Sequence, residues 1–272
     1  MVFLLITKDQ RLDTILELLS HEGKVQIHDL VRRFKVTDMT IRRDFDCLVE
    51  KGKIVRTHGG AVLAEQEDAQ GTLKLEPPYV TRMAEQASSK QAIAQTASRM
   101  IQPKQFVFLD SGTTTFSLAK SVSQDIPCTF ITNGVNLAAT LLTHQCPSVI
   151  IIGGEVDLNT WSSRGTLAEA QINNFHADIA FLACNAISPD GNVMIGNLTE
   201  LGLKQKIMSV SDKIYLLADS SKFDSHSLTT YASVRDFDGI ITDSAIPEKI
   251  QAHIKKLGGN LILAETAVGI TK

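Results

Sequence analysis

Three short loops rich in Gly, Ser, Thr and Asn contain residues suited to binding a small anion. Each follows an apolar segment: residues 110–115, 132–134 and 153–155. Where such a loop opens a helix, its backbone N–H groups and hydroxyls face the anion, and the helix dipole favours negative charge. One Gly-rich turn is common in proteins, but three in succession favour a site for a phosphorylated small molecule.

Charged residues later in the chain could complete this site. Lys204 and Lys222 could donate to an anion, and Glu200 and Asp219 could bind sugar hydroxyls. Taken singly, each lysine is more simply explained as an exposed side chain. The predicted effector-binding residues are Asp110, Gly112, Thr113, Thr114, Thr132, Asn133, Gly153, Gly154, Glu200, Lys204, Asp219 and Lys222.

A second set of residues, near the N-terminus, is suited to DNA. The guanidinium fork of Arg42 or Arg43 can pair with a guanine edge or clamp a phosphate, and Thr40 can contact a phosphate or a thymine methyl group. Residues 32–58 hold eight basic and four acidic side chains. The alternative is that the arginine pair belongs to an ordinary solvated helix face. We predict DNA contacts from Thr37, Thr40, Arg42, Arg43, Arg56 and His58.

These residues need a helix-turn-helix to position them. Apolar spacing predicts helices over residues 9–20, with Asp9 as N-cap, over 27–34, and from Thr37 or Asp38 to before Gly52. In this motif the second helix after the turn enters the major groove. Residues 54–62 predict two strands around a Gly-Gly turn, a wing that places Lys53, Arg56 and His58 near the DNA backbone.

From residue 79 onward, apolar runs alternate with helical stretches. Strands are predicted at 106–109, 128–131, 149–152, 179–183, 214–218, 239–242 and 260–263, and helices at 90–101, 115–122, 135–143, 167–175, 198–210 and 247–257. Continuously apolar strands are typical of a sheet covered on both faces. We predict an α/β fold with a mostly parallel sheet, whose ligands lie at the carboxyl ends of the strands.

Composition agrees with a two-domain cytoplasmic protein. The chain has 272 residues, is 43% hydrophobic, and has a net charge of −3. Residues 1–63 hold 11 Lys/Arg against 9 Asp/Glu, whereas the remainder holds 16 against 21. We expect a winged helix-turn-helix domain at 1–63, a polar linker at 64–78 and an effector-sensing domain at 79–272. The four cysteines are scattered, and neither a signal peptide nor a membrane span is expected.

Two motifs near the N-terminus resemble the DeoR family of bacterial transcriptional regulators. Residues 36–45 read VTDMTIRRDF and residues 56–61 read RTHGGA, similar to the family's TIRRDL helix and its R-x-HGGA wing. Phe45 stands where the family usually has Leu. The resemblance implies that Thr40, Arg42 and Arg43 contact DNA, and we expect Asp44 to orient an arginine because phosphate would repel it.

The resemblance continues to residue 263. Ser-Lys-Gln-Ala-Ile-Ala at 89–94, Asp110-x-Gly-Thr-Thr, Glu200-x-x-x-Lys204 and Asp219-x-Ser-Lys-Phe are similar, in that order, to the family's effector domain. That domain is related in fold to ribose-5-phosphate isomerase and glucosamine-6-phosphate deaminase, and it senses phosphorylated sugars. The chain departs from the family at 184–187, Cys-Asn-Ala-Ile, where a Gly-containing turn is usual. Asn185 could bind a ligand or form the turn.

The resemblance implies a repressor of a carbohydrate-use operon. A phosphorylated sugar would release it from double-stranded operator DNA. We expect a homo-oligomer, with no cofactor, metal or membrane partner, and we expect Lys90, just after the linker, to couple the pocket to the DNA-binding part. The alternatives are a sugar-phosphate isomerase or deaminase with a DNA-binding extension, using Asp110 or Glu200 as base, and a pure oligomerisation scaffold.

Overall fold

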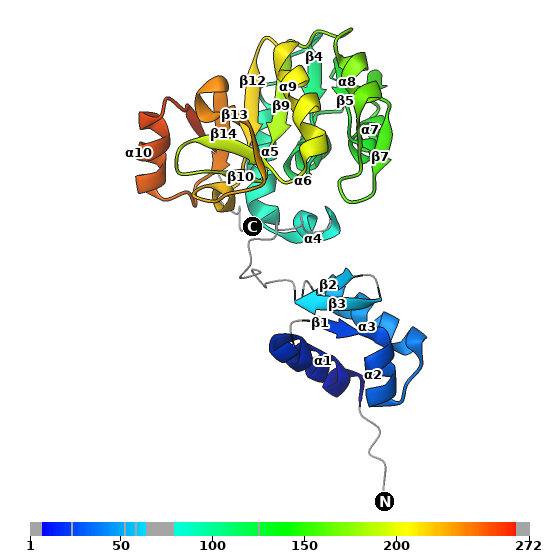
Figure 1. Cartoon of the computed structure of the whole chain (residues 1–272). Helices are drawn as coiled ribbons and strands as arrows, with labels where there is room; N and C mark the ends of the chain where they lie inside the picture. The colour runs from blue at the N-terminus through cyan, green and yellow to red at the C-terminus, as the bar shows by residue number, and fades with distance from the viewer. Residues whose placement is uncertain are drawn as a thin grey trace, which may run out of the picture. The chain divides into compact units, whose positions relative to one another are not determined.

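The structure is a computed structural model that describes residues 7–22, 24–51, 53–57, 59–63, 79–124 and 126–264. It divides into two compact units, Met1–Leu73 and Lys74–Lys272 (Figure 1). The first is called the DNA-binding unit below and the second the sensor unit. The predicted linker at 64–78 and the predicted DNA contact His58 lie outside the described residues.

Three helices and a three-stranded sheet make up the described residues of the DNA-binding unit. Its elements are α1 (Lys8–Glu22), β1 (Lys24–Gln26), α2 (Ile27–Phe34), α3 (Asp38–Glu50), β2 (Ile54–Thr57) and β3 (Gly60–Leu63). The three predicted helices and the β-hairpin are therefore confirmed. The predicted cap at Asp9 is wrong: Thr7 Oγ1 accepts from Gln10 N at 3.3 Å, and Gln10 Oε1 accepts from Thr7 N at 3.1 Å.

Strand β1 was not predicted, because three residues carry too little alternation to identify a strand. It pairs antiparallel with β3, so the sheet order is β1-β3-β2. The backbones of β1 and β3 lie very close together at Gly60, where an added Cβ would lie 2.0 Å from the Val25 carbonyl oxygen. Gly60 therefore has a packing role as well as a turn role.

One apolar core holds this unit together. Ile15 and Leu19 of α1, Leu30 of α2 and Phe45 of α3 are buried in it, as are Leu12, Val25, Ile27, Ile41, Leu48, Ile54 and Ala61. The aromatic ring at position 45 is fully buried. The departure from the family's leucine thus concerns packing and not the exposed face of α3.

The sensor unit is built on a seven-stranded parallel sheet. Its strand order is β15-β14-β12-β9-β4-β5-β6. The strands are β4 (Phe106–Leu109), β5 (Thr129–Thr132), β6 (Ser148–Ile151), β9 (Ile179–Ala183), β12 (Ile214–Leu217), β14 (Gly239–Asp243) and β15 (Leu261–Ala264). All seven predicted strands are confirmed to within one residue at either end, and the sheet is parallel as expected.

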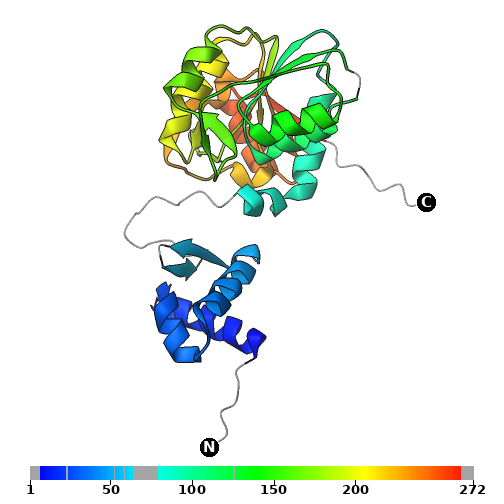
Figure 2. The ribbon, with the colours of Figure 1, turned by 90° about the vertical axis from the view of Figure 1, so that its right-hand side faces the viewer.

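Helices cover both faces of this sheet (Figure 2). Val107 and Leu109 point to a core shared with α5 (Ala87–Ser98), α6 (Thr113–Ser121) and α7 (Val135–Thr143). Phe108 points to the opposite core, shared with α8 (Thr166–Ile172), α9 (Leu201–Ser209) and α10 (Glu248–Lys256). Alternate residues of each strand are thus buried on opposite faces, which explains why the strands are continuously apolar.

Several short elements of the sensor unit were not predicted. They are helix α4 (Tyr79–Ala84), the hairpin of β7 (Glu155–Asp157) and β8 (Ser162–Arg164), and an antiparallel sheet of β10 (Ala186–Ile187), β11 (Asn192–Ile195) and β13 (Thr229–Ser233). Short 3₁₀ turns η1 (Leu198–Glu200), η2 (Ser220–Lys222) and η3 (Val234–Asp236) also occur. The single helix predicted over 198–210 is therefore η1 followed by α9. In the described part of the chain, no helix has both the length and the apolarity to cross a membrane.

Candidate functional site

Helix α3 begins with a built-in cap that fixes its first turn. Thr37 is the N-cap: its Oγ1 accepts from Thr40 N at 3.3 Å, and the two hydroxyls lie 2.9 Å apart. An N-terminal turn is electropositive and suits a DNA phosphate. Met39 in this turn is 60% exposed, and we did not identify it from the sequence.

The exposed face of α3 carries the two predicted arginines. Arg42 and Arg43 are exposed, whereas Ile41, Asp44 and Phe45 are buried. Arg42 forms an ion pair with Asp38 one turn earlier. The structure therefore places both guanidinium groups at the surface of a helix whose other face is the core of the unit.

Arg56 of the wing is tied to α3. Its Nη2 donates to the Arg42 carbonyl oxygen at 2.5 Å and lies 2.9 Å from Asp46 Oδ1. In this arrangement Arg56 holds β2 against α3. Its role in the unit is thus partly structural, which the sequence motif did not show.

Asp44 lies inside the unit and pairs with Arg11 of α1. Arg11 Nε donates to Asp44 Oδ2 at 2.5 Å, and Arg11 Nη2 donates to Oδ1 at 3.0 Å. This hydrogen bonding raises the pKa of Arg11. Asp44 does orient an arginine, as expected, and that arginine joins α1 to α3.

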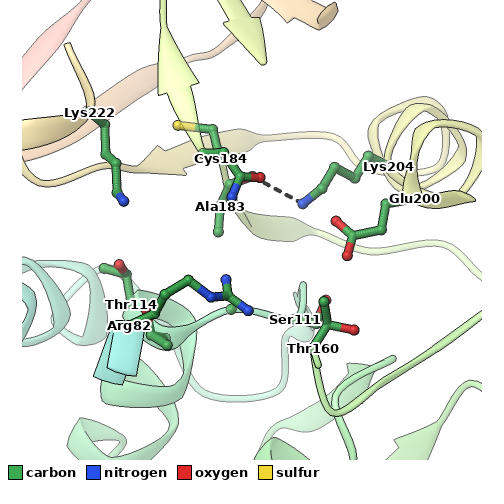
Figure 3. Close-up of a pocket in the computed structure, with 12 residues that line it drawn as sticks. Arg82, Ser111, Thr114, Thr160, Ala183, Cys184, Glu200, Lys204 and Lys222 are labelled. Atoms are coloured by element: carbon green, nitrogen blue, oxygen red, sulfur yellow. Dashed lines mark hydrogen bonds between the residues drawn. The ribbon is translucent and has the colours of Figure 1, made fainter. Parts of the chain in front are cut away.

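A cleft of about 500 Å³, counting the part open to solvent, lies at the carboxyl ends of β4 and β9 (Figure 3). Side chains from α4, the β7–β8 hairpin, η1, α9 and η2 complete its walls. The lining residues are Arg82, Ser111, Gly112, Thr113, Thr114, Thr160, Ala183, Cys184, Asn185, Glu200, Lys204 and Lys222.

The N-terminus of α6 forms one wall. Phe116 N donates to Gly112 O at 3.0 Å, so the earlier N–H groups of the turn have no partner within the helix. Gly112 has φ +154°, and an added Cβ would lie 2.9 Å from Ala183 Cβ. A glycine is therefore needed here, and it lets the loop lie close to the end of β9.

Lys204 lies at the opposite wall and is held by an ion pair. Its Nζ lies 2.5 Å from Asp110 Oδ2 and donates to Ala183 O at 3.0 Å. Burial, the largest influence, lowers the pKa of Lys204, but Asp110 and Glu200 together raise it above the ordinary value. Lys204 is thus a permanent cation at neutral pH.

Six predicted effector residues lie in the lining: Gly112, Thr113, Thr114, Glu200, Lys204 and Lys222. Figure 3 shows Lys204 and Lys222 on one side of the cleft and Thr114 on the other. The geometry combines N–H donors, hydroxyls, two ammonium groups and one carboxylate. Such a set can bind a molecule that carries both an anionic group and hydroxyls.

The other six lie outside the lining, and their role in binding an effector stays a prediction. Asp110 pairs with Lys204 behind the wall, and Asn133 Oδ1 accepts from Ser111 N at 3.0 Å. Thr132 Oγ1 accepts from Gly134 N at 3.0 Å, and Asp219 Oδ1 accepts from Ser221 N at 3.1 Å. Gly153 and Gly154 pack against Gln171 and Arg164. These contacts shape the loops.

Of the other six lining residues, the sequence analysis named Asn185 as one alternative ligand contact. It did not assign the remaining five: Arg82, Ser111, Thr160, Ala183 and Cys184. Ser111 and the residues after β9 could have been found from their strand-end positions. Burial raises the pKa of Cys184 to about 12, so its thiol is neutral. Asn185 Oδ1 accepts from Gly196 N at 3.0 Å, which agrees with the turn-forming alternative.

Comparisons with known proteins cover both units. Residues 11–67 match the DeoR-like helix-turn-helix domain, and residues 85–244 match the DeoR C terminal sensor domain. A candidate aga operon transcriptional repressor of Escherichia coli O157:H7 is 33% identical, covering 93% of each chain. The L-fucose operon activator of Haemophilus influenzae is 30% identical over 90% of this chain and 95% of its own. The glycerol-3-phosphate regulon repressor of Escherichia coli K12 is 30% identical over 89% and 93%.

Solved structures match parts of the chain at low identity and low TM-score. Ribose 5 phosphate isomerase A of Neisseria gonorrhoeae is 15% identical, with a TM-score of 0.37 over 50% of this chain and 53% of its own. The translation initiation factor eIF-2B of Pyrococcus horikoshii OT3 is 14% identical, with a TM-score of 0.42 over 86% and 81%. The sequence matches, together with the helix-turn-helix and the α/β sensor unit, show that the chain belongs to the DeoR family of transcriptional regulators.

Proposed function

We propose that this regulator represses a carbohydrate-use operon by binding operator DNA through α3 and its wing. Exposed Arg42 and Arg43 on a capped helix support this role, since arginine pairs with guanine and phosphate. Thr37 and Thr40 lie in the first turn, where phosphate contacts form. Arg56 supports the position of the wing and contributes positive charge.

We propose that the effector is a phosphorylated sugar bound in the cleft. The observation that carries this proposal is the juxtaposition of the α6 N-terminus with Lys204 and Lys222. These groups suit a phosphate, and the buried carboxylate of Glu200 suits sugar hydroxyls. The sensor unit has a net negative charge, which repels an anion. The N–H groups of α6 and the two ammonium groups must therefore attract the phosphate against this overall electrostatic field.

Release from DNA requires that the effector bind the DNA-free conformation more tightly than the DNA-bound one. We also propose a homo-oligomer in the cytoplasm, because two copies present two recognition helices to paired half-sites. An enzymatic role is less well supported. Of the two candidate bases, Asp110 lies behind the cleft wall in an ion pair and does not line the cleft.

The test begins with operator fragments selected from genomic DNA by the full-length protein. Thermal shifts are measured with pentose and hexose phosphates, with and without this DNA, and sedimentation gives the oligomeric state. The expected result is that one phosphorylated sugar stabilises the protein and lowers DNA affinity, without being turned over. Turnover of the sugar phosphate, or no response to any of them, would reject the sensor role.

A lysine pair provides the matched control. Lys222→Ala should weaken the effector response because Lys222 lines the cleft. Lys206→Ala should leave it unchanged, since Lys206 Nζ donates to Asn173 Oδ1 outside the lining. An unchanged response in Lys222→Ala would mean that the anion binds elsewhere.

A further inference from the structure

Helix α4 is the first described element of the sensor unit, and an aromatic cluster anchors it. Tyr79 Oη accepts from Asn136 Nδ2 at 2.5 Å. Its ring stacks on Trp161 of the β7–β8 hairpin, with centroids 6.3 Å apart, and meets Phe116 edge-on at 6.3 Å. Burial raises the pKa of Tyr79 to about 12. The start of α4 is thus packed against both the hairpin and α6.

The end of α4 is held by a buried ammonium group. Lys90 of α5 is buried, and its Nζ donates to the Arg82 and Glu85 carbonyl oxygens. The last carbonyls of a helix have no partner within the helix, so a cation here caps them. Lys90 therefore fixes the position of the Arg82 backbone.

Arg82 extends from this fixed backbone into the wall of the cleft. Figure 3 shows its side chain on the Thr114 side, opposite Lys222. Its Nη2 donates to the Asn159 carbonyl oxygen at 3.2 Å, and its guanidinium carbon lies 5.7 Å from the centroid of the Tyr79 ring. One arginine thus contacts α4, the hairpin and the cleft.

The charges of the cleft indicate what Arg82 can bind. The charge of Lys204 is largely neutralised by Asp110, and Glu200 adds a negative charge nearby. An anionic ligand therefore depends on further cations, and the lining offers Lys222 and Arg82. A guanidinium fork binds phosphate through two parallel N–H donors, which an ammonium group cannot match.

We infer that Arg82 is a direct ligand of the effector's anionic group, and that this bond adds to the contacts of Tyr79 and Lys90 that hold α4. This inference rests on the proposed effector function of the cleft. In the chain, residues 64–78 join α4 to the DNA-binding unit. Because linkage is reciprocal, an effector bonded to Arg82 favours the placement of α4 in which Arg82 reaches the cleft. Occupancy of the site then biases the position of α4, the first described element of the sensor unit.

Trp161 is the only tryptophan in the chain, and its ring stacks on Tyr79 of α4. Its fluorescence therefore reports on the contact between α4 and the β7–β8 hairpin. Full-length wild type, Arg82→Ala, Arg82→Lys and the control Arg99→Ala are titrated with inorganic phosphate and with pentose and hexose phosphates. Arg99 is an exposed arginine at the end of α5, outside the cleft lining. Affinity is taken from thermal shift and calorimetry, and α4 contact from Trp161 emission and acrylamide quenching.

We expect Arg82→Ala to bind about tenfold to a hundredfold more weakly, as for the loss of a hydrogen-bonded charged group. We expect Arg82→Lys to be intermediate and Arg99→Ala to match wild type. Binding should change Trp161 emission in wild type but not in Arg82→Ala, even at saturation. A change in Trp161 emission caused by ligand contact with the neighbouring Thr160 would persist in Arg82→Ala. Loss of the emission change in this variant therefore shows that Arg82 transmits binding to α4.

The outcomes separate the two proposals. If wild type and Arg99→Ala bind none of the compounds, the effector function itself is rejected and the inference fails with it. If wild type binds and Arg82→Ala binds equally well, Arg82 is not a ligand, although the effector function stands. If saturated wild type shows unchanged Trp161 emission, α4 does not respond to the effector.

Discussion

Lys204 Nζ lies 2.5 Å from Asp110 Oδ2, and the two side chains are only 3% and 1% exposed. A buried ion pair is costly to break on one side, because an uncompensated charge is left inside the protein. We predict that Asp110→Asn lowers the free energy of unfolding of the sensor unit by about 3–5 kcal/mol. Urea unfolding followed by far-UV circular dichroism measures this loss.

The control for this prediction removes both charges. Asp110→Asn combined with Lys204→Met should recover most of the lost stability, because the buried ammonium group is no longer left without Asp110. The double variant should nevertheless have lost effector binding, since Lys204 lines the cleft. Equal stability of the single variant and wild type would contradict the assigned role of the pair.

The same pair predicts a difference at alkaline pH. The folded-state pKa of Lys204 is raised above its ordinary 10.5. Between pH 10.5 and the raised folded-state pKa, the folded protein binds more protons than the unfolded chain. The free energy of unfolding therefore falls as pH rises through this range. The stabilisation from Lys204 is complete below pH 10.5 and is lost as pH passes the raised pKa.

The measurement compares melting temperatures of wild type and the double variant from pH 9 upward. Tyr79 and Tyr215 are present in both proteins. Tyr231 lies beside the pair, with Lys204 Nζ 5.4 Å from its ring centroid, so Tyr231→Phe is introduced into both proteins. The wild-type advantage should therefore shrink above pH 10.5. A constant difference across the range would show that Lys204 does not titrate as described.

Gly112 and Gly153 lie in two of the predicted anion-binding loops, but substituting each of them by Ala should have different effects on stability and on the effector response. Gly112→Ala places a Cβ 2.9 Å from Ala183 Cβ at φ +154°, whereas an added Cβ at Gly153 lies 3.4 Å from the flexible Gln171 side chain. We predict that Gly112→Ala costs about 1–3 kcal/mol through strain and abolishes the effector response. Gly153→Ala should keep both properties. Thermal melts and effector titrations distinguish the variants, and equal effects would mean that both loops face the ligand.

Arg43 provides a test of the DNA-binding face. Arg43→Ala should leave the melting temperature unchanged, since the side chain is exposed. If Arg43 contacts a phosphate, affinity falls uniformly across DNA sequences and the salt slope decreases by about 1. If it pairs with guanine, discrimination at one base pair falls instead by about 1–3 kcal/mol. Fluorescence anisotropy at several salt concentrations measures both, with Arg99→Ala as the charge-matched control. Unchanged binding would remove Arg43 from the interface.

The sheet of the sensor unit could be predicted because its strands are buried on both faces. Runs such as Phe106–Leu109 and Ile179–Ala183 are apolar at almost every position, and they occur between helices with clear periodicity. The helix-turn-helix was equally accessible, because Ile41, Phe45 and Leu48 mark one face of α3. Boundaries and caps were less accurate, as Thr7 shows, since neighbouring polar residues can serve equally well as a cap.

The cleft could be predicted only where it follows the edge of the sheet. The loop after β4 and the Glu200–Lys204 pair were identified from local pattern and family resemblance. Arg82 and Thr160 were not, because α4 and the β7–β8 hairpin are too short to have a detectable period and reach the cleft only through tertiary packing. Conversely, Thr132 and Asn133 have suitable chemistry but lie outside the lining. Asn133 accepts from Ser111 N in the neighbouring loop, and Thr132 accepts from Gly134 N in its own loop.

The cleft walls are drawn from six separate segments between Arg82 and Lys222, and each contributes only a few side chains. The two apolar cores lie on the faces of the sheet, and among the lining residues only Cys184 packs against one of them. Ligand preference can therefore diverge through single substitutions in one segment, while the cores and the DNA-reading helix keep their own constraints. Substitutions confined to the lining segments would therefore let proteins with this fold evolve specificity for new metabolites while the fold itself is kept.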